Sequence, residues 1–185
     1  MTGAGVLLTG GTSRRMGTDK AEIVWRGETL AVRAARVLAA VCDRVVEVGP
    51  GVSGLDAVRE DPVGAGPLAA LVAGAAALGV RQPVVLLACD LPFVEPPLLQ
   101  LLLDWPGRET VIPLVGGHLQ YTCARYGSDA LERARAALRA GDRSLRLAAD
   151  VDHDEIAEEA WQAVARPDAL ADVDTPEDLH RLGLS

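Results

Sequence analysis

The chain has 185 residues, of which 49% are hydrophobic and 24% are charged, and its formal net charge at pH 7 is -8. This length and composition favour a single globular domain with a core of its own. The negative charge argues against general nucleic acid binding, which requires a basic face that neutralises phosphates.

The cysteines and the hydropathy pattern indicate the cellular compartment in which the protein is expected to work. Cys42, Cys89 and Cys123 are odd in number and widely spaced, so neither a disulfide framework nor a zinc site is indicated. No apolar run reaches the ~20 residues of a membrane span, and the N-terminus lacks the pattern of a secretory signal. We therefore expect a cytoplasmic monomer without membrane contact.

The first stretch with chemical character is VLLTGGTSRRMGTDK, from Val6 to Lys20. Glycines allow backbone N–H groups to approach a ligand closely, and the basic side chains add full positive charge. Neither the Walker spacing nor the dinucleotide-binding spacing is present. Lys20 is the only lysine among 18 Lys and Arg residues, at a position where a compact charge is not interchangeable with arginine. The stretch predicts a polyphosphate-binding loop, the alternative for Lys20 being an ordinary surface position.

Strand and helix patterns alternate along the rest of the chain. Ala21–Trp25 is predicted to be extended, with Trp25 in the core. Short apolar runs predict strands over 6–9, 45–48, 57–59, 83–88, 111–114 and 120–125, and apolar residues at helical spacing predict helices over 29–41, 68–78, 96–103 and 128–140. This order favours a three-layer α/β/α sandwich around a mostly parallel, Rossmann-like sheet.

Two aspartates follow predicted strands. Asp90 comes after the continuous apolar run 83–88, which is typical of a central strand buried on both faces. Ligands of open α/β sheets bind at such carboxyl ends, and a carboxylate facing a polyphosphate requires a cation, for which Mg²⁺ is the usual choice. Asp61 precedes a Gly/Pro-rich loop. For both residues the alternative is a turn-forming aspartate.

The C-terminal third has charged features that are most simply structural. The arginines of helix 128–140 are expected to face solvent. The acidic run 150–155 is interpreted as a solvated loop rather than a metal cluster. Thr175 and Pro176 form a helix start, with acids in the first turn.

Three segments resemble one family. LLTGGTSRRMGTDKA is similar to the signature Leu-x-Gly-Gly-x-Ser-x-Arg-Met-Gly-x-x-Lys of the MobA-like nucleotidyltransferases, and within them to the guanylyltransferases of molybdenum cofactor biosynthesis. Cys89–Pro92 resembles the metal motif of that family. Asp172–Asp178 resembles its C-terminal motif, so that the resemblance extends from Gly5 to Leu182.

The resemblance implies a fold, a reaction and a set of site residues. The fold is a single nucleotidyltransferase domain over 1–185, of the nucleotide-diphospho-sugar transferase type, with a nucleotide-binding half (1–95) and an acceptor half (96–185). The reaction transfers GMP from GTP to molybdenum-molybdopterin with Mg²⁺ and releases pyrophosphate. Nucleotide contacts are assigned to Leu8, Thr9, Gly10, Gly11, Lys20, Asp61 and Asp90, metal coordination to Asp90, catalytic charge stabilisation to Arg15 and Lys20, and pterin contacts to His118, Tyr121 and the 141–145 turn.

Several positions depart from the family pattern and keep alternatives open. Asp172 and Asp174 replace asparagines, which makes Asp174 a candidate second metal ligand. Val48-Gly49 stands where an asparagine near the nucleotide is usual. Transfer of CMP to molybdopterin, or of another nucleotide to a phosphorylated metabolite, therefore remains an alternative. So does a nucleotide-binding regulator without turnover, against which the combination of Arg15, Lys20 and Asp90 argues. Partners beyond the substrates would be transient contacts with proteins that deliver or accept the cofactor.

Overall fold

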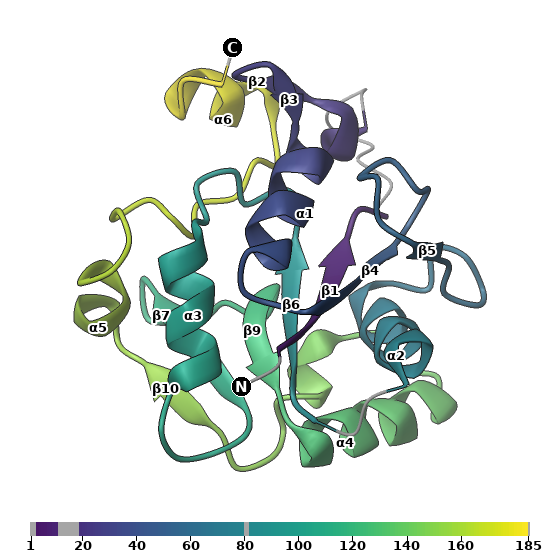
Figure 1. Cartoon of the computed structure of the whole chain (residues 1–185). Helices are drawn as coiled ribbons and strands as arrows, with labels where there is room; N and C mark the ends of the chain where they lie inside the picture. The colour runs from purple at the N-terminus through teal and green to yellow at the C-terminus, as the bar shows by residue number, and fades with distance from the viewer. Residues whose placement is uncertain (1–2, 11–18, 80–81, 185) are drawn as a thin grey trace.

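The computed structural model describes residues 3–10, 19–79 and 82–184 (Figure 1). The strands are β1 (Ala4–Leu8), β2 (Val24–Trp25), β3 (Glu28–Thr29), β4 (Arg44–Val48), β5 (Ala57–Val58), β6 (Val84–Ala88), β7 (Val111–Val115), β8 (His118–Leu119), β9 (Cys123–Tyr126) and β10 (Asp154–Ile156). The α-helices are α1 (Leu30–Ala39), α2 (Pro67–Leu78), α3 (Pro96–Asp104), α4 (Ser128–Arg139), α5 (Glu158–Gln162) and α6 (Pro176–Arg181), and the 3-10 helices are η1 (Lys20–Glu22) and η2 (Leu145–Leu147).

The main sheet has the strand order β10-β7-β9-β6-β1-β4-β5, and β8 pairs with β7 outside this path. Strand β9 runs antiparallel to both of its neighbours, whereas the other pairs along the path are parallel. The mostly parallel sheet predicted from the sequence is therefore confirmed.

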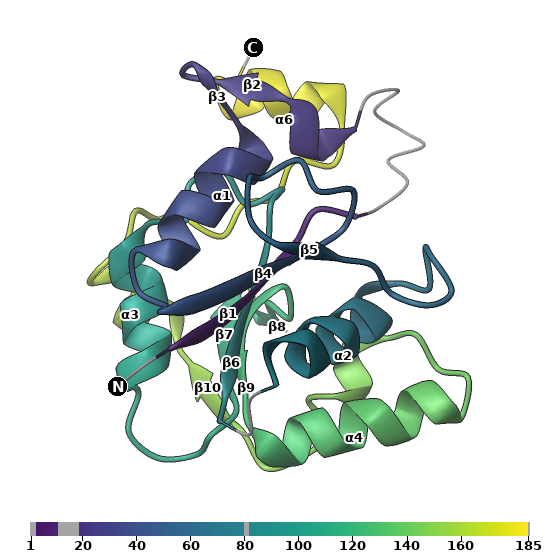
Figure 2. The ribbon, with the colours of Figure 1, turned by 45° about the vertical axis from the view of Figure 1, so that its right-hand side comes forward.

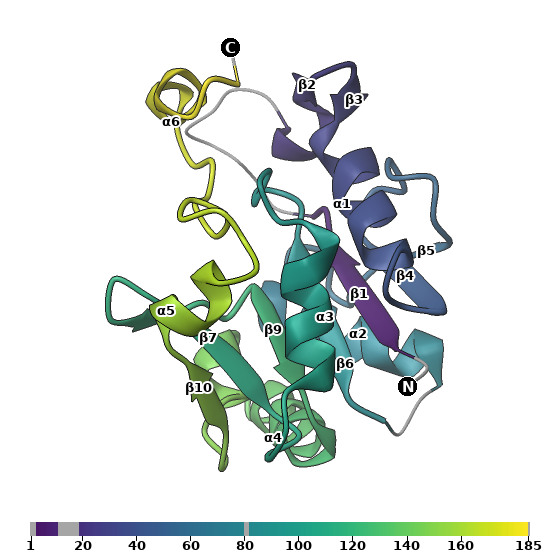
Figure 3. The same ribbon diagram turned by 60° about the vertical axis from the view of Figure 1, so that its left-hand side comes forward.

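Helices cover both faces of this sheet. Because successive side chains of a strand point to opposite faces, Val6 and Leu8 of β1 pack with α2 and α4, and Leu7 packs with α1 and α3. Figure 2 shows these two helix pairs on opposite sides of the strands. In Figure 3, α5 lies over β7 on the same side as α3, where Trp161 is completely buried. The predicted three-layer sandwich is confirmed.

A glycine allows α2 to lie close to the sheet. A Cβ atom at Gly74 would lie 2.5 Å from Cγ1 and 2.8 Å from Cγ2 of Val6, and 3.0 Å from Cγ2 of Val48. Such distances are shorter than carbon–carbon contact, so only glycine fits there. The close packing fixes α2 against β1 and β4 and thereby places the first turn of α2 near the ends of these strands.

Three predictions from the sequence were wrong in detail. Ala21 and Glu22 belong to η1 rather than to an extended segment, because the Asp19 carboxylate accepts a hydrogen bond from the Ala21 amide at 3.0 Å. The strand predicted over 120–125 begins only at Cys123, since Gln120 accepts hydrogen bonds from the amide and hydroxyl of Thr122 and closes a turn. Asp154, expected in a solvated loop, begins β10.

The prediction that Trp25 lies in the core is confirmed. Trp25 is 8% exposed and packs edge-on against Phe93, with ring centroids 5.2 Å apart. Cys42, Cys89 and Cys123 are free and buried. Among the described residues, no helix has the length and apolar character needed to cross a lipid bilayer.

Arg125 of β9 is a buried cation that is bonded to carbonyl groups. It is 6% exposed and donates to the backbone oxygens of Leu103, Trp105, Arg108 and Glu109 at 2.6 to 3.2 Å. These carbonyls belong to the end of α3 and the turn that follows it. A single guanidinium therefore fixes the connection between α3 and β7.

We expect Arg125→Met to destabilise the fold, because the substitution leaves four inward-facing carbonyls without a donor. The cost should be about 3 kcal/mol or more, which corresponds to a fall in Tm of about 6 to 12 °C for a chain of this size. Thermal unfolding measures it. Arg135→Met on the exposed side of α4, where Arg135 pairs with Glu132 at 2.9 Å, is the control and should change stability by less than about 0.5 kcal/mol. Equal Tm values for the two variants would contradict the role of Arg125.

Candidate active site

The strand order reverses between β1 and β6. The chain passes from β1 through α1 to β4 and β5 on one side, and returns through α2 to β6 on the other side of β1. Ligands of open α/β sheets bind outside the carboxyl ends of the strands at such a reversal of strand order. The two ends are joined there, since the Cys89 amide donates to the Leu8 carbonyl at 3.0 Å.

A cavity of about 260 Å³ lies at this point, which we call the first cavity. It is lined by Leu8, Thr9, Gly10, Asp19, Lys20, Pro67, Ala88, Cys89, Asp90 and Thr122. The structure thus brings together Leu8, Thr9, Gly10, Lys20 and Asp90 from the predicted site. Gly11 and Arg15 belong to 11–18, outside the described residues.

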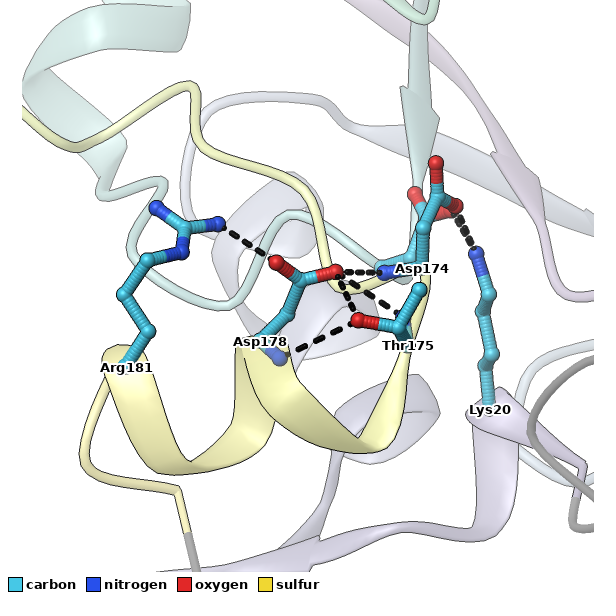
Figure 4. A network of polar contacts seen from close by, with 6 residues as sticks. Lys20, Asp174, Thr175, Asp178 and Arg181 are labelled. Atoms are coloured by element: carbon cyan, nitrogen blue, oxygen red, sulfur yellow. Dashed lines mark hydrogen bonds and ion pairs between the residues drawn. The ribbon is translucent and has the colours of Figure 1, made fainter.

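Lys20 is held between two carboxylates. Its Nζ donates to Oδ2 of Asp90 at 3.1 Å and forms a short contact with Oδ1 of Asp174 (Figure 4). The side chain of Lys20 is 18% exposed, and those of Asp90 and Asp174 are 25% and 55% exposed. Segments from the start, the middle and the end of the chain therefore meet at one ammonium group.

Lys20 and Asp90, both half-buried, perturb each other's ionisation. Burial by itself lowers the pKa of Lys20, but the hydrogen bond with Asp174 and the charge of Asp90 outweigh it, so the pKa is raised. Burial raises the pKa of Asp90, and the Lys20 ammonium opposes this rise without cancelling it. The charges of Asp172 and Asp174 add to the rise. A second cation at Asp90 would favour the charged carboxylate further.

The start of α6 positions Asp174, as Figure 4 shows. Oδ2 of Asp178 accepts hydrogen bonds from the amides of Asp174 and Thr175 and from the Thr175 hydroxyl, at 2.9 to 3.0 Å. The Thr175 hydroxyl accepts in turn from the Asp178 amide, which completes a capping box. The Val173 amide donates to the Asp90 carbonyl at 3.0 Å. The predicted helix start is confirmed, and it places a carboxylate at the first cavity.

These carboxylates fit a Mg²⁺ ion that is shared with a substrate. Asp90 and Asp174 offer oxygen atoms that converge on one point, the Nζ of Lys20. Mg²⁺ is usually bound by one or two carboxylates together with substrate phosphates. No group of three or more His, Cys, Asp or Glu side chains suited to a metal occurs in the described part of the chain.

A second cavity, of about 400 Å³, adjoins the first and shares Leu8, Gly10, Asp19 and Pro67 with it. Its other walls include Gly49, Pro50, Arg59 and Glu60. Asp61 is exposed and is not among the lining residues, although Glu60 and Val63 on either side of it are. The nucleotide contact assigned to Asp61 stays a prediction. The family resemblance identified Asp61 as a candidate, whereas no motif in the sequence identified Glu60, which lines the second cavity.

The amides at the end of β1 are engaged within the protein. Those of Thr9 and Gly10 both donate to the Val48 carbonyl, at 3.2 and 3.3 Å. They are therefore not free donors for a phosphate in this structure. Among the described residues of this stretch, Lys20 carries the positive charge of the first cavity.

A third cavity, of about 590 Å³, is lined by Tyr121, Ser144, Arg146, Asp150 and His153 together with three apolar residues. Tyr121 of this cavity immediately precedes Thr122, which lines the first cavity. The structure brings Tyr121 to this third cavity together with Ser144 of the 141–145 turn. His118, in β8, is exposed and is not among the lining residues.

Comparison with known proteins assigns the family. Residues 5–156 match the model of the MobA-like NTP transferase domain. The chain belongs to this family. It is therefore a nucleotidyltransferase, as the sequence predicted.

Named relatives and solved structures agree. The chain is 39% identical over 154 residues to a probable molybdenum cofactor guanylyltransferase of Opitutus terrae, covering 77% of this chain and 75% of the relative. It is 33% identical over 193 residues to one of Chloroflexus aggregans, covering 95% and 91%. The fold matches molybdopterin-guanine dinucleotide biosynthesis protein A of Archaeoglobus fulgidus with a TM-score of 0.79 at 22% identity, covering 96% and 95%.

The single lysine makes the central contact measurable. With lysine labelling of the metal-free protein, the side-chain signals of Lys20 report its titration by NMR. We expect a pKa above the ordinary 10.5, and a lower pKa in Asp174→Asn, which loses one negative charge. Because the pKa is raised, the stability that the ammonium contributes is present below the unfolded pKa and is lost as pH rises through the folded pKa. Asp129→Asn, on the exposed start of α4, is the control. An unchanged pKa in Asp174→Asn would contradict the contact.

Proposed function

We propose that the protein transfers GMP from GTP to the terminal phosphate of molybdenum-molybdopterin and releases pyrophosphate. The proposal is supported chiefly by the contact of Lys20 with Asp90 and Asp174, which lies where the strand order of this MobA-like domain reverses. Relatives that are 33 to 39% identical are named probable molybdenum cofactor guanylyltransferases. The free, buried cysteines suit the reducing cytoplasm, where we place the reaction.

The triphosphate would lie in the first cavity. Lys20 would donate to its phosphate oxygens, and Asp90, with Asp174 as the candidate second ligand, would hold Mg²⁺, which supplies charge neutralisation on the phosphates when bound. Pro67 starts α2, a helix with no side-chain cap and no acidic residue in its first turn. The positive end of its dipole is therefore free to favour an anion beside it. The base and ribose would extend into the second cavity, between Gly49, Pro50 and Glu60.

The acceptor would occupy the third cavity, beside Thr122. Arg146 offers a cation there that has no ion-pair partner among the described residues, and Tyr121 offers an aromatic face. Both suit an anionic ligand with a ring system. In this placement the acceptor phosphate would reach the nucleotide past Tyr121 and Thr122, which are adjacent in the chain and line the third and the first cavity.

The reaction requires no protein nucleophile. An oxygen of the acceptor phosphate is anionic at pH 7 and attacks the α-phosphorus of GTP, the new P–O bond replaces the bond to the β-phosphate bridge oxygen, and pyrophosphate leaves. Cys89 lines the first cavity, but burial raises the pKa of its thiol, which makes it a poor nucleophile. The contribution of the protein is in-line positioning and charge stabilisation.

The first test is calorimetric titration with GTP, CTP, ATP and UTP in Mg²⁺, followed by pyrophosphate release with molybdenum-molybdopterin. We expect GTP to bind tightest and pyrophosphate release to depend on the acceptor. Tightest binding of CTP would move the activity to cytidylyl transfer, which Val48 and Gly49 at the second cavity leave open because neither offers a side-chain amide. Binding without any release would indicate a regulator, and no binding of any nucleotide would refute the proposal.

Lys20→Ala and Asp90→Ala test the charged residues. Each should lower pyrophosphate release by about a hundredfold or more, because transition-state charge stabilisation is lost, and each should leave the thermal unfolding transition cooperative. Asp129→Asn provides an exposed control whose turnover should match that of the unsubstituted protein. Turnover of either alanine variant at the control rate would exclude the assigned role of that residue.

A further inference from the structure

Glu47 is the second-last residue of β4, and its carboxylate is buried with no exposed surface. Its Oε1 accepts hydrogen bonds from the Thr9 hydroxyl at 2.5 Å, the Gly51 amide at 2.7 Å and the Val52 amide at 3.1 Å. Its Oε2 accepts from the amide of Ser53 at 2.9 Å and from the hydroxyl of the same residue at 2.5 Å. Within the described part of the chain, no Lys or Arg forms an ion pair with Glu47.

Burying a carboxylate removes it from water at a cost of several kcal/mol, and the five hydrogen bonds that it accepts offset this cost. An apolar side chain in its place would leave those donors without an acceptor. The neighbouring strand residues Val45, Val46 and Val48 are apolar, and both valines flanking Glu47 in the strand, Val46 and Val48, are buried. The carboxylate fixes the positions of two segments, because its five hydrogen bonds come from Thr9 and from residues 51–53.

Those two segments form walls of the proposed nucleotide site. Thr9 directly follows β1 and lines the first cavity, and the 49–53 loop contributes Gly49 and Pro50 to the second. The segments also touch directly. The Thr9 and Gly10 amides bond to the Val48 carbonyl, and a Cβ atom at Gly49 would overlap the Thr9 hydroxyl and lie 2.8 Å from the Gly10 nitrogen.

We propose that Glu47 is a positioning residue for the nucleotide, whose carboxylate holds the end of β1 and the 49–53 loop in the arrangement that receives the nucleoside triphosphate. The proposal rests on the nucleotide binding proposed above. Glu47 has no contact with the cavities themselves and acts through Thr9, Gly51, Val52 and Ser53. The carboxylate form is required because donors surround both oxygens, and an amide in its place would set an N–H₂ group against a backbone N–H.

The test compares Glu47→Gln with the unsubstituted protein, using Mg²⁺ and the nucleotide that the unsubstituted protein binds tightest. We expect the Kd of that nucleotide to rise about tenfold or more, as for the loss of a buried hydrogen bond to a charged group. The KM for the nucleotide should rise in step, and kcat at saturating nucleotide should stay within about twofold, because Glu47 does not touch the reacting atoms.

Ser53→Ala is the second variant. It removes one hydroxyl donor, leaves the carboxylate in place, and should raise Kd by about threefold or more. In the double variant Glu47→Gln/Ser53→Ala the two effects on Kd should not add, since Ser53 acts through Glu47. If Glu47→Gln does not fold, an unchanged Kd in Ser53→Ala overturns the proposal.

Thr110→Val is the matched control for general destabilisation. Thr110 is 2% exposed, its hydroxyl accepts from the Gly127 amide at 3.1 Å, and it lines none of the three cavities. Its loss should lower Tm and leave Kd unchanged. A Kd in Glu47→Gln equal to that of the unsubstituted protein, or an equal rise in Thr110→Val, would overturn the role of Glu47. No nucleotide binding by the unsubstituted protein would instead refute the proposed function.

Discussion

The contact of Lys20 with Asp90 and Asp174 joins segments that are 70 and 154 residues apart along the chain. One ammonium faces two carboxylates, so the centre has an excess of negative charge before any substrate arrives. A metal ion would satisfy that excess, and a triphosphate would then compete with the carboxylates for Lys20. The proposed function thus gives the same residues two roles, an ion-pair contact within the fold without a ligand and the binding of a metal nucleotide when one is present. The remainder of the sheet serves to bring the three segments to one point.

Two other buried charges show a related use of ionic groups. Glu47 accepts hydrogen bonds from Thr9 and from the loop residues 51–53. Arg125 donates hydrogen bonds to four carbonyl groups in the connection between α3 and β7. Neither has an ion-pair partner among the described residues. A charged group bonded only to backbone and hydroxyl groups holds irregular chain in a defined shape, which apolar packing cannot do because it has no direction. The loops of this protein are therefore ordered by polar groups that the regular elements carry.

The sequence predicted the parts of the molecule that have regular patterns. The apolar run before Asp90 identified a central strand, and the first-turn residues Thr175 and Pro176 identified α6. It did not predict β10 or α5, because a strand of three residues and a helix of five are too short to show periodicity. The sequence identified Lys20, Asp90 and Asp174 as candidate site residues, but it did not predict that they contact one another. A contact across 154 residues depends on the whole fold. Glu47 carried a signal, a carboxylate inside the apolar run 45–48, whose meaning required the positions of Thr9 and Ser53.

The arrangement of the cavities suggests how base choice and chemistry are separated. Lys20 and Asp90 lie at the first cavity, near the ends of β1 and β6, whereas the second cavity is bounded by the 49–53 loop and by the segment before α2. The polar groups on the side of the second cavity include the backbone of Val48 and Gly49 and the side chains of Arg59 and Glu60. If the base of the nucleotide binds there, the backbone shape of the 49–53 loop would determine its recognition as much as any one side chain would. Glu47 holds the loop through hydrogen bonds that involve neither Lys20 nor Asp90, so the sequence of the loop could change while those two residues stay the same. If the loop contacts the base as proposed, nucleotide preference could then change separately from the charged residues.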